Sequence, residues 1–381
     1  MSADVKAAVP EASHARVAPQ LRLASFNDYE AIAHVGSANL LRTGPFQDWQ
    51  RLWLDSPLWS RLGKDWPMGW LLETASGEIV GTFMNLPSLY KFRGHDLICG
   101  NSRAWAVMPE YRGYALWLID EYFNQTTADL CVSTTAGPTA TPVVDRCATR
   151  IPRGAWDAYS YWLIGYPGLV RDKLRRQRVP LSKLVSYPAG LTLSLAFGLL
   201  SKPLPKLAGG FSIEAADRFD SRFDAFWDEL VRQNPEKLIA ERSGRALLWH
   251  FGVPMRAGRL WIFTASRDRR LRAYCVFTRI GEGVRCSVRL VDYQTLEPDA
   301  DLLPGFLRVA LRRCSQEDIH VLENYGRGVP KMRAFDECAP YHKKLLSWRF
   351  YYRAADAALD SALRDPRFWD PSVYDGDAAF G

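Results

Sequence analysis

One change of periodicity constrains the fold of this chain more than any other feature. Three β-rich runs follow one another at Met68–Thr74, Ile79–Leu86 and Leu97–Val107, and short segments of turn composition connect them. Such spacing is typical of antiparallel hairpins. The pattern ends at Pro109, and apolar residues then recur at helical spacing before another β-rich run. A meander that passes into a strand, helix, strand crossover predicts a mixed sheet.

The segments on either side of this meander extend the same unit. A short strand at Leu21–Ser25 leads into a helix that an Asn-Asp pair begins, and a second helix carries an aromatic stripe typical of a core face. After the crossover, Thr141 and Pro142 begin another helix, and a last strand follows at Tyr159–Ile164. The predicted order is β, α, α, β, β, β, α, β, α, β.

Length and composition predict two such units. A chain of 381 residues is too long for one ordinary core, and 48% of it is hydrophobic, so there is enough material for two. We expect a disordered N-terminus at 1–20, a first domain at 21–165, a connector at 166–210, a second domain at 211–353 and a C-terminal tail at 354–381.

The predicted connector carries the net charge of the chain. From Arg171 to Lys206 it has eight basic residues and one acid, Asp172, and this charge of +7 equals that of the whole chain. Residues 184–201 carry no charge and are rich in leucine. The pairing fits an interfacial element at an anionic membrane, an apolar helix buried between the domains, a docking surface for an acidic acyl carrier protein, or a solvated basic helix. The uncharged run has the lower length limit of a membrane span, but Pro188, Gly190 and Gly198 argue against one. It argues against general nucleic-acid binding.

The cysteines and the N-terminus indicate a compartment. The seven cysteines are odd in number, widely spaced and without a Cys-x-x-Cys pair, which indicates reduced thiols in a core. The first twenty residues lack the continuous apolar segment and basic start of a signal peptide. We therefore expect a cytoplasmic protein without a metal, and peripheral contact with the inner membrane face is the alternative.

The end of the meander reads Trp105-Ala-Val-Met-Pro-Glu-Tyr-Arg-Gly-Tyr-Ala-Leu, and this run resembles the GNAT superfamily of acyl-CoA N-acyltransferases. In that family a strand ending in aromatic-x-Val is followed by Pro-x-Tyr-Arg-Gly and directly by a helix. The resemblance implies an α/β fold of two tandem GNAT-like domains, each a mixed, mostly antiparallel twisted sheet flanked by helices, with the second domain degenerate. It also implies acyl-CoA or acetyl-CoA as the donor.

Phosphate binding at a helix start is the physical reason for this pattern. Backbone N–H groups that no side chain obstructs cradle a pyrophosphate, and the helix dipole favours its charge. An arginine in the loop adds a charge-assisted contact. The resemblance further implies that the preceding strand offers backbone groups to pantetheine. The residues that we expect to bind the donor are Trp105, Val107, Arg112, Gly113, Tyr114 and Ala115.

The chain departs from the family pattern at the loop and at the catalytic positions. Trp117 stands where the family has a small residue, and it either points away from the ligand or narrows the site in favour of another pantetheine carrier. Where the family often has a catalytic Tyr, this chain has Asp145, Arg146 and Cys147. Cys147 fits a core position better than a nucleophile. Asn101 lies where the third strand often offers a carboxylate, so the sequence identifies no catalytic residue.

The second half is similar to a weaker copy of the first. Strand and helix patterns between Phe211 and Pro330 follow the same order, but no Arg-Gly-x-Ala loop appears. Arg242–Phe251 resembles a run in the C-terminal halves of tandem GNAT-like proteins. We expect the first copy to keep the donor site and the second to serve structure or acceptor recognition. Four polar residues either line a second cleft or are satisfied structurally: His250, Asp292, His320 and Asn324.

These features predict an N-acyltransferase that moves an acyl group from acyl-CoA to an amine of a small molecule, such as a sugar, an amino acid or a related metabolite. One alternative is an enzyme of the N-acyl amino acid synthase type, which takes its acyl group from acyl carrier protein. A second is an aminoacyl-tRNA-dependent transferase of the Fem type. A third is a catalytically silent GNAT-like binding protein.

Overall fold

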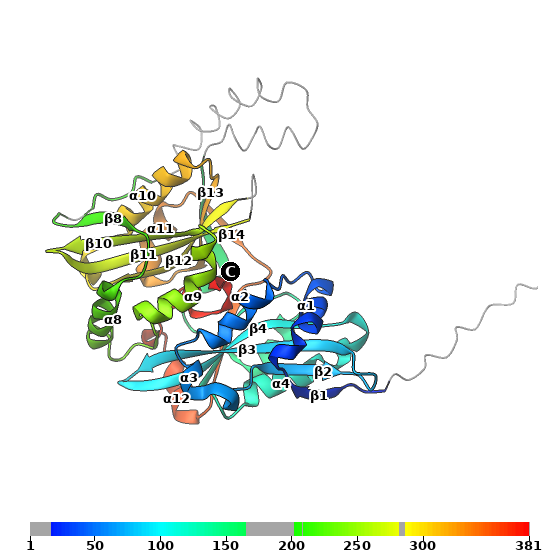
Figure 1. Cartoon of the computed structure of the whole chain (residues 1–381). Helices are drawn as coiled ribbons and strands as arrows, with labels where there is room; N and C mark the ends of the chain where they lie inside the picture. The colour runs from blue at the N-terminus through cyan, green and yellow to red at the C-terminus, as the bar shows by residue number, and fades with distance from the viewer. Residues whose placement is uncertain (1–16, 165–201, 208, 282–285, 381) are drawn as a thin grey trace, which may run out of the picture.

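The computed structural model describes residues 17–164, 202–207, 209–281 and 286–380. Its elements form two halves, each built on a mixed sheet, and the C-terminus lies between them (Figure 1). Most of the predicted connector lies outside the described residues, including the basic run that begins at Arg171 and the uncharged run 184–201. Its proposed contacts with membranes or carrier protein therefore stay predictions.

The first sheet begins with the predicted meander. The hairpin between its second and third strands closes at Gly77, whose φ of 82° suits a residue without a side chain. The next turn places Arg93 and Gly94 at φ 49° and 79°, as a two-residue type I′ turn requires. Both predicted hairpins are confirmed. In spatial order its described strands are β1 (Gln20–Leu23), β2 (Gly69–Glu73), β3 (Ile79–Phe92), β4 (His95–Val107), β5 (Leu130–Ala136), β15 (Arg349–Ala354) and β6 (Thr149–Arg150), and β9 (Ile239–Ala240) pairs with β3.

The second sheet repeats this arrangement. Its central step, from β12 to β13, is parallel like the step from β4 to β5, and its first steps are antiparallel. The predicted duplication of strand order and the mixed, mostly antiparallel sheets are confirmed. In the matching spatial order its described strands are β8 (Ser212–Ala216), β10 (Leu260–Arg267), β11 (Arg270–Ile280), β12 (Ser287–Thr295), β13 (Val321–Arg327), β7 (Ala155–Leu163) and β14 (Tyr341–Lys344).

Each sheet takes its sixth strand from the other half of the chain. β7 pairs with β13 and β14, whereas β15 pairs with β5 and β6. The placement of the strand at Tyr159–Ile164 in the first domain is therefore wrong. Its alternating pattern indicates a strand but not a partner, and the strand that pairs with β5 on the side away from β4 is β15. The two sheets consequently do not separate at residue 165.

Helices cover both faces of the first sheet. Phe83 stacks on Tyr122 of the helix after β4, whereas its neighbour Met84 faces the helices that precede β2. Neighbouring residues of a strand point to opposite faces, so these helices lie on opposite sides of the sheet. The helical elements of this half are η1 (Phe26–Asp28), α1 (Tyr29–Ala38), α2 (Phe46–Leu54), α3 (Trp59–Leu62), η2 (Gly63–Asp65), η3 (Pro109–Tyr114), α4 (Ala115–Asn124) and α5 (Thr141–Cys147).

Side-chain caps begin the first two helices of the second half. The Asp220 carboxylate accepts the N–H of Arg222 at the start of α8, and the Ser243 hydroxyl accepts the N–H of Ala246 at the start of α9. The aromatic residues Phe223, Phe226 and Trp227 of α8 are buried. The helical elements of this half are α8 (Ser221–Gln233), α9 (Gly244–Arg256), η5 (Pro298–Ala300), α10 (Leu303–Gln316), η6 (Pro330–Met332) and α11 (Arg333–Cys338).

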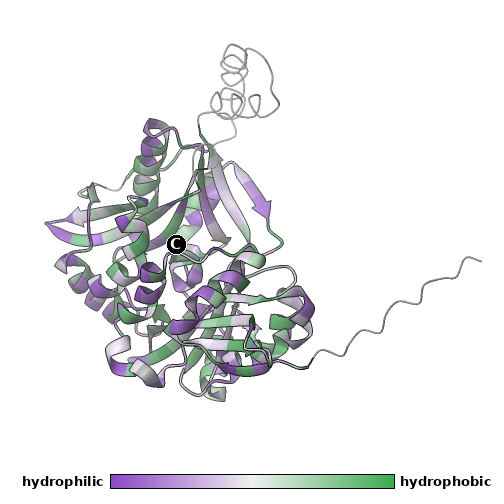
Figure 2. Ribbon diagram, turned by 45° about the vertical axis from the view of Figure 1, so that its right-hand side comes forward, coloured by the Kyte–Doolittle hydropathy of each residue, from purple (hydrophilic) through white to green (hydrophobic). Residues whose placement is uncertain are grey.

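A shared core and the C-terminal segment join the halves. Tyr90 and Phe92 of β3 belong to the same buried cluster as the core of the second half, and hydrophobic residues concentrate in the strands between the helices (Figure 2). The segment expected as a tail is folded, with Tyr374 and Phe380 buried. It comprises α12 (Ala357–Leu363), η7 (Pro366–Phe368), η8 (Val373–Asp375) and η9 (Asp377–Ala379). In the part of the chain that the structure describes, no helix has the length and apolarity needed to span a membrane.

Candidate functional site

The first sheet opens where β4 and β5 diverge. The two parallel strands pair only over Cys99–Asn101 and Leu130–Val132. Beyond that point β4 continues along β3 alone, and β5 pairs with β15 on its other side. A bulge marks the divergence, because Ala104 has a φ of 51° and the register between β3 and β4 shifts beside it. Among the described residues, the edge of β4 that faces β5 is therefore left without a ladder partner at 102–107.

The helix start beside this opening is exposed. Gly113 has free space around it, since an added Cβ would meet no atom within 4 Å, and the Arg112 side chain is exposed. The segment is a continuous 3-10 turn into α4 rather than an open loop. The N–H of Tyr111 donates to the carbonyl of Met108, and that of Ala115 donates to the carbonyl of Arg112. A ligand therefore has room here, although fewer N–H groups are available to it than an open loop offers.

The predicted donor residues lie together along the end of β4 and η3. Val107 is buried as the last residue of β4, and the buried indole N–H of Trp105 has no hydrogen-bond partner among the described residues. Tyr114 packs edge to face against Trp117 with ring centroids 5.0 Å apart. Trp117 is 42% exposed, so it lies on the outer surface of α4 rather than inside the helix packing.

The C-terminal segment enters the opening between β4 and β5. The Asp377 carboxylate accepts hydrogen bonds from the hydroxyls of Thr134 at 2.9 Å and Thr135 at 3.1 Å, both on β5. The Asp377 carbonyl accepts a bond from Nη1 of Arg103 on β4 at 3.4 Å. Gly376 makes this close approach feasible, since an added Cβ would lie 2.0 Å from Oγ1 of Thr134. Asp377 thus bridges the two diverging strands.

Asp377 is a functional candidate that the sequence analysis missed. Burial raises the pKa of its carboxyl group, and Arg103 and the two threonine hydroxyls act in the opposite direction. A carboxylate with a raised pKa is better matched to proton transfer near neutral pH than an ordinary one. The segment that carries it has neither helical nor strand periodicity, so no sequence pattern connects it with β4.

A cleft of about 570 Å³ opens on the face of the first sheet that carries α1 and α2. Its walls come from both halves and include Arg42 before α2, Ala104 on β4 and Arg259 after α9. Arg103 lines the cleft and also contacts Asp377, so the cleft reaches the opening between the strands. A ligand in it would approach β4 from the face opposite to α4.

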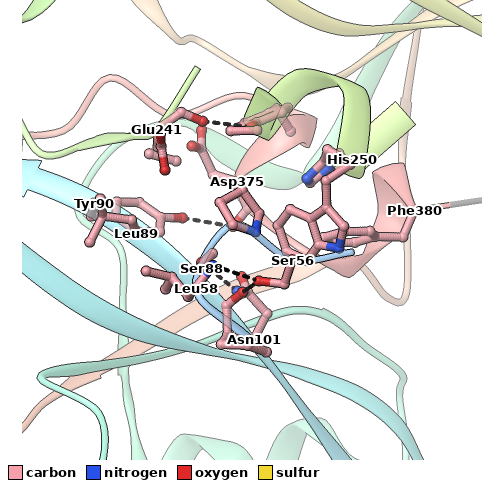
Figure 3. Close-up of a pocket in the computed structure, with 16 residues that line it drawn as sticks. Ser56, Leu58, Ser88, Leu89, Tyr90, Asn101, Glu241, His250, Asp375 and Phe380 are labelled. Carbon is pink, nitrogen blue, oxygen red and sulfur yellow. Dashed lines mark hydrogen bonds between the residues drawn. The ribbon is translucent and has the colours of Figure 1, made fainter. Parts of the chain in front are cut away.

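A much smaller cavity lies between the halves (Figure 3). Its volume of about 20 Å³ holds about one water, which excludes a substrate. Asn101 donates to Oγ of Ser88 at 2.6 Å on one side, and Tyr90 donates to the carbonyl of Asp375 at 3.1 Å on another. His250 also lines it, with no partner for Nε2 among the described residues. Burial lowers the pKa of His250 well below its usual value, so the ring is neutral.

The corresponding opening in the second sheet is filled by a buried ion network. Arg242 lies at 2.8 and 3.1 Å from the carboxylate oxygens of Asp292 on β12, and at 3.2 Å from Asp375 of the C-terminal segment. The Tyr374 ring lies 4.4 Å from the same guanidinium carbon. Burial opposes the ionisation of Asp292, yet Arg242 lowers its pKa to about 2. The charged groups here are satisfied by one another.

The helix start beside this second opening is covered. Gly305 lies in the first turn of α10, and an added Cβ would lie 2.7 Å from Leu207 and 2.6 Å from Ile213. A phosphate has no access to this turn.

Several residues singled out in the sequence have structural roles. Asp145 accepts bonds from Arg150 at 2.8 Å and from Tyr351 at 2.9 Å. Burial raises the pKa of the Cys147 thiol, which is the wrong direction for a nucleophile. Nδ1 of His320 lies 3.2 Å from the carbonyl of Ile164. Asp292 lies in the ion network and His250 lines the small cavity, whereas the buried Nδ2 of Asn324 has no hydrogen-bond partner among the described residues.

Within the described ranges, no group of three or more His, Cys, Asp or Glu side chains is placed to hold a metal ion. No family model matches the sequence, and no curated protein matches it.

The structure is nevertheless similar to solved structures at low sequence identity. One is a GCN5-related N-acetyltransferase from Anabaena variabilis, with a TM-score of 0.52, 13% identity, and coverage of 88% of this chain and 73% of that one. Another is the Saccharomyces cerevisiae N-myristoyltransferase with bound myristoyl-CoA and inhibitors, with a TM-score of 0.53, 12% identity, and coverage of 91% and 82%. Eis1 from Mycobacterium abscessus matches with a TM-score of 0.50, 12% identity, and coverage of 91% and 76%. Together with the repeated strand order and the divergence of β4 from β5, these similarities show that the chain has the fold of the GCN5-related N-acetyltransferases in two tandem copies.

Proposed function

We propose that the protein is an N-acyltransferase that takes an acyl group from acyl-CoA bound by the first half and transfers it to an amine held in the cleft between the halves. The exposed start of α4 beside the open edge of β4 is the observation that carries this proposal. The equivalent helix start in the second half is covered by Leu207 and Ile213. Structural neighbours that include an N-acetyltransferase and an N-myristoyltransferase with bound myristoyl-CoA support it.

The donor fits the residues that line this opening. Gly113 leaves space for a pyrophosphate at the helix start, where the dipole favours negative charge, and exposed Arg112 supplies a cation. The unpaired edge of β4 offers N–H and carbonyl groups to the amides of pantetheine. The indole N–H of Trp105, which has no described protein partner, is a further donor for the same chain.

The transfer follows from this placement. The amine nitrogen of the acceptor attacks the carbonyl carbon of the thioester, and the tetrahedral intermediate collapses as the C–S bond breaks. An amide forms, the sulfur leaves as the CoA thiolate, and the nitrogen loses one proton. We assign that proton to Asp377, because its carboxylate lies between the strands and has a raised pKa. This proton then passes to the thiolate, so free CoA thiol is the second product.

Binding of CoA to a blocked variant tests the donor site. Gly113→Trp should abolish the calorimetric heat of CoA and acyl-CoA binding, because the new ring fills the approach to the helix start. Gly209→Trp is the matched control, since an added Cβ there also meets no atom within 4 Å and the residue is exposed in the other half. It should bind CoA like the unchanged protein.

The same experiment separates the alternative donors. An acyl carrier protein that binds where CoA does not would replace CoA as the donor, and loss of its binding in Gly113→Trp would keep the site. If neither donor binds the unchanged protein at millimolar concentration, the donor proposal is wrong and a silent binding protein remains.

A further inference from the structure

The cleft between the halves carries more positive charge than its surroundings neutralise. Arg42, Arg103, Arg256 and Arg259 line it, whereas Asp48 is the acid among its described lining residues. Arg256 donates to Asp48 at 2.8 Å, so this pair is balanced. The other three guanidinium groups have no carboxylate within ion-pair distance in the described ranges.

The position of Arg103 makes this excess charge significant for a ligand. Its guanidinium donates to the carbonyl of Asp377, which carries no charge, at 3.4 Å. Burial lowers the pKa of Arg103, because surrounding protein replaces water around the cation, and the charge of Asp377 offsets this effect only in part. Guanidinium groups stay protonated at physiological pH, and planar oxyanions satisfy them with paired hydrogen bonds. An anion in the cleft therefore supplies the negative charge and the hydrogen-bond acceptors that these guanidinium groups lack.

The rest of the lining is apolar. Trp49 and Leu52 on α2 and Ile32 on α1 are buried and face the cleft beside Met84 of β3. The volume of about 570 Å³ lies in the range of small-molecule sites. Arginines on two walls and apolar residues between them suit a compact ligand with one oxyanion and one apolar part.

From these observations we propose that the acceptor is an amine that also carries an oxyanion, a carboxylate or a phosphate, and that Arg42, Arg103 and Arg259 hold this oxyanion. Arg42 belongs to the first half and Arg259 to the second, so the site exists only because the halves pack together. The inference rests on the proposed function for the transfer step, but not for the binding of the anion.

Matched pairs of amines test the proposal on the whole chain. Phenylalanine is compared with phenethylamine, leucine with isopentylamine, and phosphoethanolamine with ethanolamine, each with acetyl-CoA and a longer acyl-CoA. Release of CoA thiol should be at least about tenfold faster, as kcat/KM, for the anionic member of at least one pair, because a charge-assisted bond is lost in the other. Preference within the amino acid pairs identifies a carboxylate site, and preference within the ethanolamine pair identifies a phosphate site.

Arginine variants locate the effect. Arg42→Gln and Arg259→Gln should each raise KM for the anionic amine about tenfold with little change in kcat, and should leave the neutral amine unaffected. Arg245→Gln is the control, because Arg245 lies on α9 and lines a neighbouring pocket rather than the cleft. Asp48→Asn should lower KM, since it releases Arg256 to the ligand.

Binding without turnover keeps the proposal separate from the transfer reaction. Ligand-observed NMR of the anionic amines with the protein alone should show binding that Arg259→Gln weakens and Arg245→Gln does not, whether or not CoA binds. Equal turnover or equal binding of anionic and neutral amines would overturn the proposal, and so would arginine variants indistinguishable from the unchanged protein.

Discussion

The two halves share one strand order, yet their openings between parallel strands differ in what covers and fills them. In the first half β4 and β5 diverge beside an exposed helix start, and the opening contains Asp377 held by two hydroxyl groups. In the second half β12 and β13 diverge beside a covered helix start, and the opening contains the Arg242–Asp292 ion pair. The same topology thus holds a buried carboxylate bound by hydroxyl groups in one copy and a carboxylate paired with a guanidinium in the other.

This difference separates a stability role in the second opening from a chemical role proposed for the first. The C-terminal segment contacts both openings, with Asp375 at the second and Asp377 at the first. Arg242 binds Asp375 and Asp292 accepts from Ser372, so the ion network fixes the segment and holds Asp377 beside β4. Substitutions in the second opening should therefore affect stability first, and substitutions in the first should affect chemistry first.

The largest expected effect is on stability in the second opening. Asp292→Asn should lower the free energy of unfolding by about 3–5 kcal/mol, because it leaves Arg242 buried without its closest carboxylate. Chemical denaturation measures this. Glu236→Gln breaks the exposed pair with Arg93 and should change stability by less than about 1 kcal/mol. A loss of similar size in both variants would contradict the assigned role of the network.

The two carboxylates of this network differ in their response to acid. The pKa of Asp292 is about 2, below its ordinary value of 3.8, so the stability it contributes is present above pH 3.8 and is lost as the pH falls toward 2. Burial raises the pKa of Asp375, which therefore takes up a proton first. Asp375→Asn should accordingly be better tolerated than Asp292→Asn.

The next effect belongs to the first opening and concerns activity. Asp377→Asn should lower kcat about 100-fold through loss of the base, with CoA binding unchanged and stability altered by less than about 1 kcal/mol. Thr135→Val supplies a readout that a structural role would not give. It removes hydrogen bonds to the carboxylate, so the pKa should rise and the acidic limb of the pH–rate profile should move to higher pH. A kcat within threefold of the unchanged protein in Asp377→Asn would remove Asp377 from the mechanism.

A smaller effect compares the two helix starts directly. Gly305→Leu should destabilise the protein by about 2 kcal/mol, because the new side chain overlaps Leu207 and Ile213. Gly113→Leu, with open space around it, should stay within about 0.5 kcal/mol of the unchanged protein. Thermal unfolding of both variants checks the pair. Equal losses would mean that the start of α4 is as covered as that of α10.

Local patterns predicted the elements of this fold well. The turns at Gly77 and Arg93–Gly94, the amphipathic helices and the crossover after β4 follow from residue types and spacing. The exchange of β7 and β15 does not, because each has the alternation of an ordinary strand, and its partner depends on which sheet edge is free when the halves assemble. Nothing in the pattern of either strand identifies that edge.

The candidate site was predictable on its donor side alone. Gly113 and its neighbours form a contiguous motif whose chemistry can be read along the chain. Asp377 and Arg259 reach the site from segments far from β4 in sequence, and their residue types are common on any surface. Their roles become visible only when the C-terminal segment and the second half are in place.

The smallest effect concerns His250, which lies where the halves meet. Its ring stacks on Tyr374 and Phe380, and burial lowers its pKa well below 6.5. The unfolded chain therefore binds a proton below pH 6.5 that the folded protein does not, and stability falls as the pH drops. The slope should approach about 1.4 kcal/mol per pH unit between pH 6 and 5.

His250→Phe should remove this part of the slope, whereas the exposed His95→Gln should not. Denaturation of the three proteins across this pH range decides the matter. If His250→Phe keeps the slope of the unchanged protein, His250 is charged in the folded state. The interface between the halves would then be more accessible to water than its packing indicates.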